Sequence, residues 1–345
     1  MEHTKALWGM LGVVLLLGSM FSVLAAPTAD AQLTRIKLPQ GSGITTTGPA
    51  TAIGGTTTYT EHCGDIASCN QALAPNGNSQ PKIVYLDNDI TGVVGNGIVI
   101  SRNKIVFDGQ GHTITGTSDG QSGDIGISTQ FRDAVTIQNI EVTNFDLGVS
   151  AEQTSNLQLL NNKINNNNWI GASVGGGSLN NIKILNNEFQ YNGYQALVVS
   201  PSINIEIRGN FIYQNNAVCD PNYPVRLNTI TDSIITENTI KYNNNGIELY
   251  NGYNNLIYHN NFILNGYDVN VVGGSDNAFS LPYDSQNPKN GGGNHWALIG
   301  GGYCTDLYDG PDVPQTTGSP DGICDDGHTN GASDPYAFVY ENGWI

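Results

Sequence analysis

Three residues near the middle of the chain could carry out chemistry on a sugar. Arg226 and Glu248 hold corresponding positions in two successive segments, and Asp220 lies just before Arg226 in an insertion that runs from Cys219 to Pro224. A glycoside hydrolase needs two carboxylates about 5–9.5 Å apart, and Asp220 and Glu248 could supply them. A lyase or epimerase for acidic sugars instead needs a basic side chain near the reacting carbon, a role that Arg226 could fill. The alternative is a surface ion pair, which contributes less than about 1 kcal/mol.

Side chains that could bind a glycan lie close to these three residues in the sequence. Tyr223 belongs to the same insertion, Tyr250 follows Glu248 by two positions, and Lys241 precedes Glu248. An exposed tyrosine stacks on sugar rings and forms hydrogen bonds through its hydroxyl group. Tyrosine is also a favoured strand residue, so the recurrence of tyrosines in this region has two explanations. The recurring set includes Tyr191, Tyr194, Tyr213, Tyr242, Tyr253, Tyr258 and Tyr267.

These residues lie in a series of repeats whose starts are spaced 22 to 28 residues apart. Each repeat contains a phrase of the form aliphatic-x-(Asn/Gly/Glu/His)-x-x-hydrophobic, followed by two hydrophobic residues at alternate positions. Alternation with a period of two predicts short strands. Two or three such strands cannot bury their apolar side alone, whereas stacked repeats can, so we expect a parallel β-solenoid. The phrase begins at Ile137, Leu159, Ile184, Ile207, Ile235 and Ile257.

Stacking places corresponding residues of successive repeats in columns, with neighbouring coils about 4.8 Å apart. Arg226 and Glu248 are therefore expected to be neighbours in an outward column of Ser150, Ser173, Val198, Arg226, Glu248 and Asn270. A second outward column holds the mixed charges of Glu141, Lys163 and Glu188. An asparagine follows each phrase at nearly the same offset, which predicts a ladder of side-chain amides at one corner. Its expected members are Asn144, Asn166, Asn192, Asn215, Asn243 and Asn265.

Two stretches of the sequence resemble right-handed parallel β-helix proteins with carbohydrate-binding and sugar-hydrolase repeats. Residues 95–116 are similar to an opening coil, mainly through the run DGQGHTI at 108–114. The C-terminal stretch resembles the tail of secreted members through NHW at 294–296, acidic loops, and DPY at 334–336. The group includes pectate-lyase-like enzymes and the NosD-type periplasmic proteins linked to copper delivery. The resemblance extends through the repeats and implies the fold rather than one function.

The N-terminus and the cysteines indicate an exported protein. Residues 1–31 are typical of a signal peptide, because Lys5 precedes an apolar stretch and Ala29-Asp30-Ala31 forms a cleavage site. No later apolar run approaches the roughly 20 residues of a membrane span. In an oxidising compartment, we expect disulfides between sequence-local cysteines near the two ends. The expected pairs are Cys63–Cys69 and Cys304–Cys324, which leaves Cys219 over.

The charge of the chain is strongly negative and unevenly distributed. The formal net charge of −17 over 345 residues excludes nucleic acid as a partner, because few basic residues could neutralise phosphates. Residues 276–345 contain ten acidic residues and one lysine, and so carry −9 of this charge. Aspartates among glycines and prolines could surround a hard cation with oxygens, and calcium fits such a site. The candidate ligands are Asp306, Asp309, Asp312, Asp321, Asp325 and Asp326.

We therefore expect an all-β protein that is secreted, periplasmic or at the cell surface. Its fold is predicted to be a right-handed parallel β-helix of eight or nine coils with disulfide-stapled ends. The predicted parts are a signal peptide (1–31), a Thr/Gly-rich leader and N-terminal cap (32–81), the β-helix (82–275) and an acidic C-terminal cap region (276–345). By resemblance, the protein binds an extracellular polysaccharide or cell-envelope glycan and, if it is an enzyme, cleaves or modifies it. A structural or adhesive surface protein and a copper-handling accessory protein are the alternatives, and the oligomeric state stays open.

Overall fold

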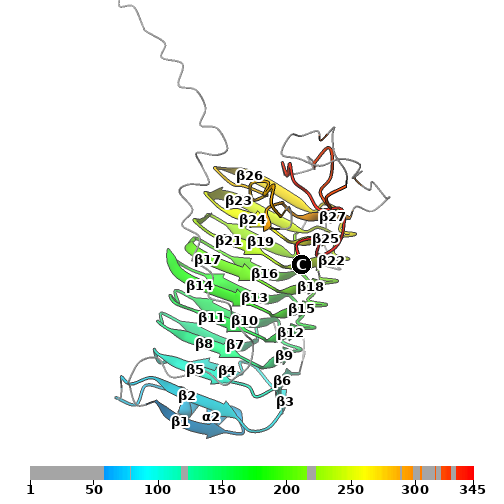
Figure 1. Cartoon of the computed structure of the whole chain (residues 1–345). Helices are drawn as coiled ribbons and strands as arrows, with labels where there is room; N and C mark the ends of the chain where they lie inside the picture. The colour runs from blue at the N-terminus through cyan, green and yellow to red at the C-terminus, as the bar shows by residue number, and fades with distance from the viewer. Residues whose placement is uncertain are drawn as a thin grey trace, which may run out of the picture. The chain divides into compact units, whose positions relative to one another are not determined.

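Parallel strands of successive coils stack on one another in the described residues from Tyr59 to Ala297 (Figure 1). The computed structural model describes residues 58–77, 79–117, 123–215, 223–287, 290–297, 304, 315, 320–327 and 332–345. The expected signal peptide, most of the expected leader, and Cys219 fall outside these residues. Apart from one short helix, the elements of the described residues are strands, which confirms the predicted parallel β-helix.

Each coil contributes strands to three faces, and strands of successive coils pair in parallel. The first face comprises β4 (Ile98–Ile100), β7 (Ile125–Gln130), β10 (Leu147–Glu152), β13 (Ile170–Gly175), β16 (Gln195–Val199), β19 (Val225–Asn228), β23 (Ile247–Tyr253) and β26 (Val269–Ser275). The second face comprises β1 (Tyr59–Cys63), β2 (Lys82–Leu86), β5 (Ile105–Asp108), β8 (Val135–Gln138), β11 (Gln158–Leu160), β14 (Leu179–Leu185), β17 (Ser202–Arg208), β20 (Ile230–Thr231), β21 (Ile234–Thr236) and β24 (Leu256–Tyr258).

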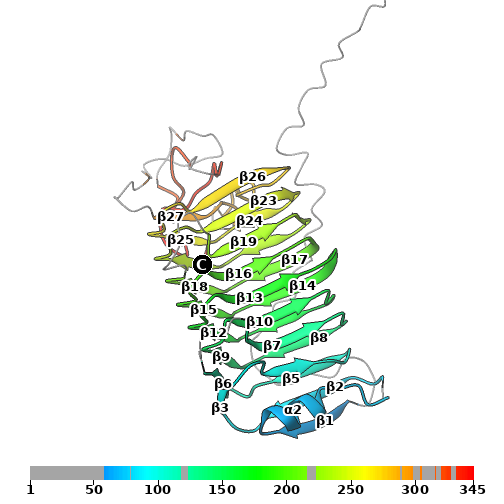
Figure 2. The same cartoon turned by 180° about the vertical axis from the view of Figure 1, so that it is seen from behind.

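The third face is a separate sheet of nine strands, which lie in one row in the view from behind (Figure 2). They are β3 (Ile90–Val93), β6 (Thr113–Gly116), β9 (Glu141–Thr143), β12 (Lys163–Asn165), β15 (Glu188–Gln190), β18 (Phe211–Tyr213), β22 (Thr239–Lys241), β25 (Asn261–Ile263) and β27 (His295–Ala297). Parallel pairing thus begins before Lys82, with β1, and continues after Ser275, with β27.

The hydrophobic core lies between the three faces and is filled from alternate strand positions. In β19, Val225 and Leu227 are buried while Arg226 between them is exposed. The same alternation predicted the buried pairs of the neighbouring first-face strands, and burial confirms it for β13, β16 and β23. Val271 of β26 is an exception, because the alternation with buried Val269 predicts an inward side chain whereas Val271 is exposed.

Two ladders of buried asparagines flank the third face. In each ladder, the side-chain amide of one asparagine donates to the amide oxygen of the asparagine in the next coil, at 2.9–3.4 Å. The same oxygen also accepts a backbone N–H of the preceding coil, so the ladder satisfies polar groups at a corner that excludes water. The first ladder comprises Asn162, Asn187, Asn210, Asn238, Asn260 and Asn294, and the second comprises Asn167, Asn192, Asn215, Asn243 and Asn265.

The predicted ladder corresponds to the second one, and two of its expected members were wrong. Asn144 and Asn166 lie one residue before the ladder position, with left-handed φ values of 61° and 54°. The ladder position itself holds Phe145 in the first of these coils and Asn167 in the next. Asparagine suits both a left-handed corner and a ladder, so adjacent asparagines cannot be assigned from their type alone.

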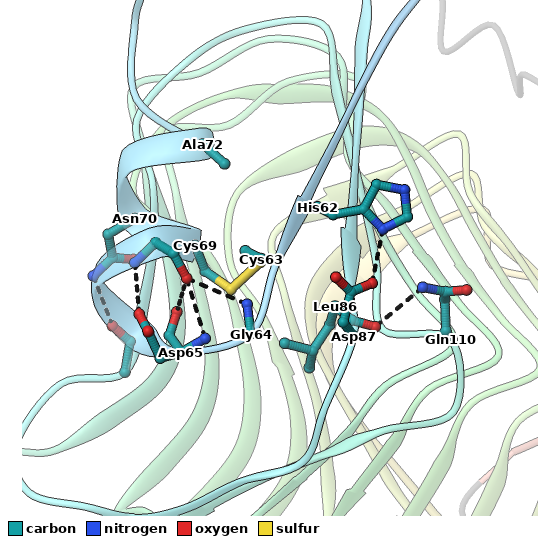
Figure 3. The surroundings of a disulfide bond; sticks show 12 residues. His62, Cys63, Gly64, Asp65, Cys69, Asn70, Ala72, Leu86, Asp87 and Gln110 are labelled. Carbon is teal, nitrogen blue, oxygen red and sulfur yellow. Dashed lines mark hydrogen bonds and ion pairs between the residues drawn. A yellow bond between two sulfur atoms is a disulfide. The ribbon is translucent and has the colours of Figure 1, made fainter.

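The N-terminal end is closed by the helix α2 (Ile66–Ala72), which the predicted disulfide Cys63–Cys69 ties to β1 (Figure 3). Asp65 caps α2 by accepting the backbone N–H of Ser68 at 2.7 Å. Lys82 is buried beneath the helix, where its Nζ donates to the carbonyl of Ala72 at 2.6 Å. In the described residues, no helix is long and apolar enough to span a membrane.

The C-terminal end is closed by β27 and by the chain that follows it. Trp296 of β27 stacks on Phe262 of the preceding coil, with ring centroids 4.5 Å apart. Farther along the chain, Asn342 exchanges two hydrogen bonds with Asn261 of β25. The predicted disulfide Cys304–Cys324 is also confirmed, with a sequence separation of 20 residues.

Candidate functional site

Arg226 and Glu248 are neighbours on the outer surface of the first face, as the repeats predicted. They are register partners in β19 and β23, and Nε of Arg226 lies 2.9 Å from a carboxylate oxygen of Glu248. Glu248 is the less exposed of the two, with 19% of its side chain accessible against 45% for Arg226. The register confirms the predicted column, although its first member, Ser150, is buried. The column runs through Ser150, Ser173, Val198, Arg226, Glu248 and Asn270.

Of the other residues predicted for this site, Tyr250 lies in the same strand as Glu248, whereas Lys241 lies on a different sheet. Tyr250 is exposed, and lies two positions after Glu248 in the same strand. Tyr223 lies two residues before β19, and its carbonyl accepts the side-chain amide of Gln195 at 3.2 Å. Lys241 belongs to β22 on the third face, and so to a different sheet. Asp220 lies outside the described residues.

The geometry limits what the described part of this site can do. The carboxylate of Glu248 is oriented by its charge-assisted contact with the guanidinium of Arg226. Hydrolysis with two carboxylates would require a second acid, a role for which Asp220 stays a prediction. The pair could bind or polarise an acidic sugar through the exposed side of the Arg226 guanidinium.

A cluster of aromatic rings lies on the outside of the third face, and we call it the aromatic ridge. It consists of Tyr191, Phe211, Tyr213 and Tyr242, which come from three successive coils. The ring of Tyr213 lies 5.6 Å from that of Tyr191 and 5.8 Å from that of Tyr242, and is perpendicular to both. Tyr191 and Tyr242 are half exposed, at 49% and 46%. Partial desolvation and the neighbouring Tyr213 raise the pKa of Tyr191 above its ordinary value.

Strand propensity does not explain the two outer rings of the ridge. Tyr191 and Tyr242 stand at the corner after the strand, with left-handed φ values of 55° and 56°. The same corner position holds Asn144 and Asn166 in two earlier coils, also with positive φ. Asparagine meets this backbone requirement at least as well as tyrosine. The presence of tyrosine at these two positions is therefore better explained by a role of the exposed rings than by the backbone conformation of the corner.

Lys241 belongs to the aromatic ridge through its cation–π contacts. Its Nζ lies 5.9 Å from the centre of the Phe211 ring and 5.5 Å from that of Tyr242. Both distances fall within the range in which a cation is attracted to the face of a ring. Sequence reasoning identified Lys241 and the tyrosines separately but missed Phe211 and the contact between them, because the residues come from different coils.

The acidic C-terminal candidates are only partly described. Asp321 accepts hydrogen bonds from the hydroxyl of Tyr283 and the backbone N–H of Ile323, both at 2.9 Å. Asp325 is buried and Asp326 is exposed. Asp306, Asp309 and Asp312 lie outside the described residues, so calcium binding by this set stays a prediction.

Comparison with known proteins assigns the chain to a family. Residues 75–301, more than half of the chain, match the family described as periplasmic copper-binding protein (NosD). The chain belongs to the NosD family. No curated protein sequence matches it.

Solved structures similar to this NosD-family chain are distant from it. The enzymatically active domain of tailspike protein 2 of bacteriophage CBA120 is 14% identical, with a TM-score of 0.42, and the alignment covers 70% of this chain and 39% of that one. ORF18 of Geobacillus virus E2 is 14% identical, with a TM-score of 0.44 and coverage of 69% and 59%. An alginate lyase from Paenibacillus sp. str. FPU-7 is 16% identical, with a TM-score of 0.34 and coverage of 73% and 98%. At these identities and scores, the likenesses do not bear on function.

The family description names copper, and the described side chains do not fit a copper centre as they stand. Protein copper sites use methionine, histidine and cysteine ligands. The described cysteines are all in disulfides. His62 and His112 each pair with an aspartate, while His259 and His295 each bond to a backbone carbonyl through one ring nitrogen. In the part of the chain that the structure describes, no three or more His, Cys, Asp or Glu side chains form a group that could hold a metal ion.

Proposed function

We propose that this NosD-family protein binds an extracellular polysaccharide or cell-envelope glycan along the outside of its coils. The observation that carries the proposal is the aromatic ridge, in which tyrosine rings from three successive coils lie side by side and the outer two, Tyr191 and Tyr242, are half exposed. Aromatic rings are effective at stacking on sugars because each buries a large apolar area and carries a polar hydroxyl group. The spacing of the rings follows the stacking of the coils, and so is close to the length of one sugar unit in an extended chain.

The proposed place of action is outside the cytoplasm. Two disulfides support it, because disulfides persist in oxidising compartments and are rare in the cytosol. The expected signal peptide and the periplasmic description of the family agree with this proposal. A protein that acts on polysaccharides in such a compartment meets its ligand without crossing a membrane.

The first face offers a second component of this function, which is modification of the bound glycan at Arg226 and Glu248. Glu248 follows Tyr242 in the same coil, so the ion pair and the aromatic ridge lie on adjoining faces of the same coils. A glycan held on the ridge could reach the first face around that corner. Tyr250 would then stack on a sugar unit next to the ion pair, with Tyr223 on its other side.

The experiment that tests the binding proposal removes rings without disturbing the corner. The double variant Tyr191→Asn and Tyr242→Asn places asparagine where other coils already have it, so the fold should persist. Binding is measured by surface plasmon resonance with immobilised alginate, polygalacturonate, xylan and dextran. Loss of two stacking contacts should weaken binding about tenfold or more.

The matched control is Phe131→Asn. Phe131 is an exposed aromatic residue with a left-handed φ of 54°, but it lies at a corner between the first and second faces. Its replacement should leave binding unchanged. Equal affinities of the wild type and the double variant, or no binding of the wild type to any of the four polysaccharides, would overturn the proposal.

A further inference from the structure

Lys241 is the one charged residue on the three successive third-face strands β18, β22 and β25, all of which the structure describes. The middle residue of each strand is buried, and so is Asn261 at the start of β25, so the other outer residues define the surface. These residues are Phe211, Tyr213, Thr239, Lys241 and Ile263. The corner residues that follow are also uncharged, namely Gln214, Tyr242 and Leu264. The ammonium group therefore stands in an aromatic and otherwise neutral patch.

The contacts of Lys241 differ from those of four other basic residues in the described chain. Lys82, Lys183 and Arg208 each lie within 4.0 Å of a glutamate carboxylate, as Arg226 does. The interactions of Lys241 are instead with the rings of Phe211 and Tyr242. A cation–π contact restrains an ammonium group but leaves its N–H donors available to an acceptor. A ligand carboxylate is the acceptor that suits such a donor.

The net charge of the chain strengthens this argument. With a formal charge of −17, the protein as a whole repels a polyanion, so recognition of an acidic glycan depends on local positive charge. A neutral glycan would gain binding free energy from the aromatic rings alone and would make no ionic contact with Lys241. An acidic sugar could stack on a tyrosine ring while its carboxylate pairs with Lys241.

We propose that the aromatic ridge selects acidic polysaccharides, with Lys241 binding the carboxylate of a uronate unit that stacks on Tyr213 or Tyr242. This inference rests on the proposed function and adds the substrate class and the residue that recognises it. The stacked ring supplies contact area, and the ammonium group supplies the preference for charge. The selected ligand is a chain of uronic acids that lies against the third face.

The test compares each acidic polysaccharide with its own neutral ester. The probes are polygalacturonate against fully methyl-esterified pectin, and alginate against its propylene glycol ester. Wild type should prefer an acidic form by about tenfold, the effect of one charge-assisted hydrogen bond. Lys241→Gln should remove that preference while keeping affinity for the ester, and Lys241→Arg should retain it. Added salt should weaken wild-type binding to the acidic form more than binding of the glutamine variant.

Lys163→Gln is the matched control, because Lys163 is exposed on the same sheet but has Glu141 and Glu188 as register partners. Its replacement should leave the preference intact. Equal wild-type affinity for acid and ester, or a preference that survives in Lys241→Gln, would overturn this inference and leave the binding proposal standing. Failure of the wild type to bind any of these four probes would overturn this inference, and it would overturn the binding proposal as well if xylan and dextran are not bound either.

Discussion

The side-chain amide of Asn294 donates to a carboxylate oxygen of Asp334 at the point where the first asparagine ladder ends. The backbone N–H of Asn294 and Nε1 of Trp296 donate to the same oxygen, at 2.7 and 2.8 Å. Each amide in the ladder donates toward the C-terminal end, so the last asparagine presents a donor with no further asparagine to accept it. The buried carboxylate of Asp334 accepts a hydrogen bond from that donor. It thereby favours the common direction in which all the amides of the ladder donate.

Replacing Asp334 with asparagine should destabilise the C-terminal end of the β-helix. The side chain of Asp334 is fully buried and accepts four N–H donors from Asn294, Trp296 and Tyr336. An amide has one oxygen, so at least one donor would lose its acceptor, at a cost of about 1–3 kcal/mol. Urea unfolding at pH 7, followed by tryptophan fluorescence, measures the change. Asp276→Asn is the exposed control, and equal stabilities of the two variants would contradict this assignment.

Asp268 closes the second ladder in a similar way and should make stability depend on pH. Its Oδ1 accepts the amide of Asn265 at 3.0 Å, while its buried Oδ2 has no hydrogen-bond partner. Burial raises the pKa of Asp268 to about 6, so the folded protein binds this proton more tightly than the unfolded chain does. The stabilising contribution is complete below about pH 4 and is lost as the pH rises through 6.

The variant Asp268→Asn removes this titration and isolates its effect. Burial lowers the pKa of His259 and of His295, and these groups change stability in the opposite direction, but they are common to both proteins. The free energy of unfolding of the variant minus that of the wild type should rise by up to about 3 kcal/mol between pH 4 and pH 8. Urea unfolding across this range measures the difference. If the free energies of unfolding of the two proteins vary with pH in the same way, Asp268 does not make stability depend on pH.

Asn210→Ala tests the interior of the first ladder. The amide oxygen of Asn210 accepts the backbone N–H and the side-chain amide of Asn187, and its own amide donates to the carbonyl of Ile184. Alanine leaves these buried groups unsatisfied, and we expect a loss of about 2–4 kcal/mol in the free energy of unfolding. Asn180→Ala, at an exposed position of β14, should cost less than about 1 kcal/mol. A similar loss in both variants, measured by thermal unfolding, would argue against the ladder as a stabilising element.

The coil architecture and the pairing of Arg226 with Glu248 could be predicted because they depend on a repeat. Once the period is known, stacking determines which residues are neighbours, whatever lies in the loops. The contact of Asn294 with Asp334 could not be predicted in this way. The two residues lie 40 positions apart in a part of the sequence without repeats, and no periodic pattern relates them.

The contacts within the aromatic ridge could not be predicted from the repeats alone. The tyrosines were recognised as possible sugar contacts, yet Tyr191 and Tyr242 face outward from a corner and Phe211 from a strand. Each of these three rings contacts the ring of Tyr213, so the cluster joins strand and corner positions of successive coils. Side-chain direction at a left-handed corner has no signal in hydrophobic alternation, so the cluster needed the structure.

Calcium should stabilise the C-terminal region if its aspartates form the proposed site. Addition of calcium chloride is expected to raise the midpoint of thermal unfolding, and a chelator should reverse the effect, because a bound ion favours the folded state. Asp326→Asn should weaken binding in isothermal titration calorimetry with little change in calcium-free stability, since Asp326 is exposed. Asp276→Asn should leave calcium binding unchanged. No heat of binding and no shift of the midpoint in the wild type would exclude calcium from this region.

Glu248→Gln tests whether the ion pair on the first face modifies a bound glycan. The exposed pair with Arg226 contributes under about 1 kcal/mol, so the variant should fold with nearly wild-type stability. If Glu248 acts as an acid or base, product formation from alginate or polygalacturonate should fall at least about a hundredfold, the usual contribution of such a group. The assays follow unsaturated products and reducing ends. Glu152→Gln, an exposed glutamate of the same face, should retain full activity, and a wild-type protein that binds these polysaccharides but releases no product would restrict the function to binding.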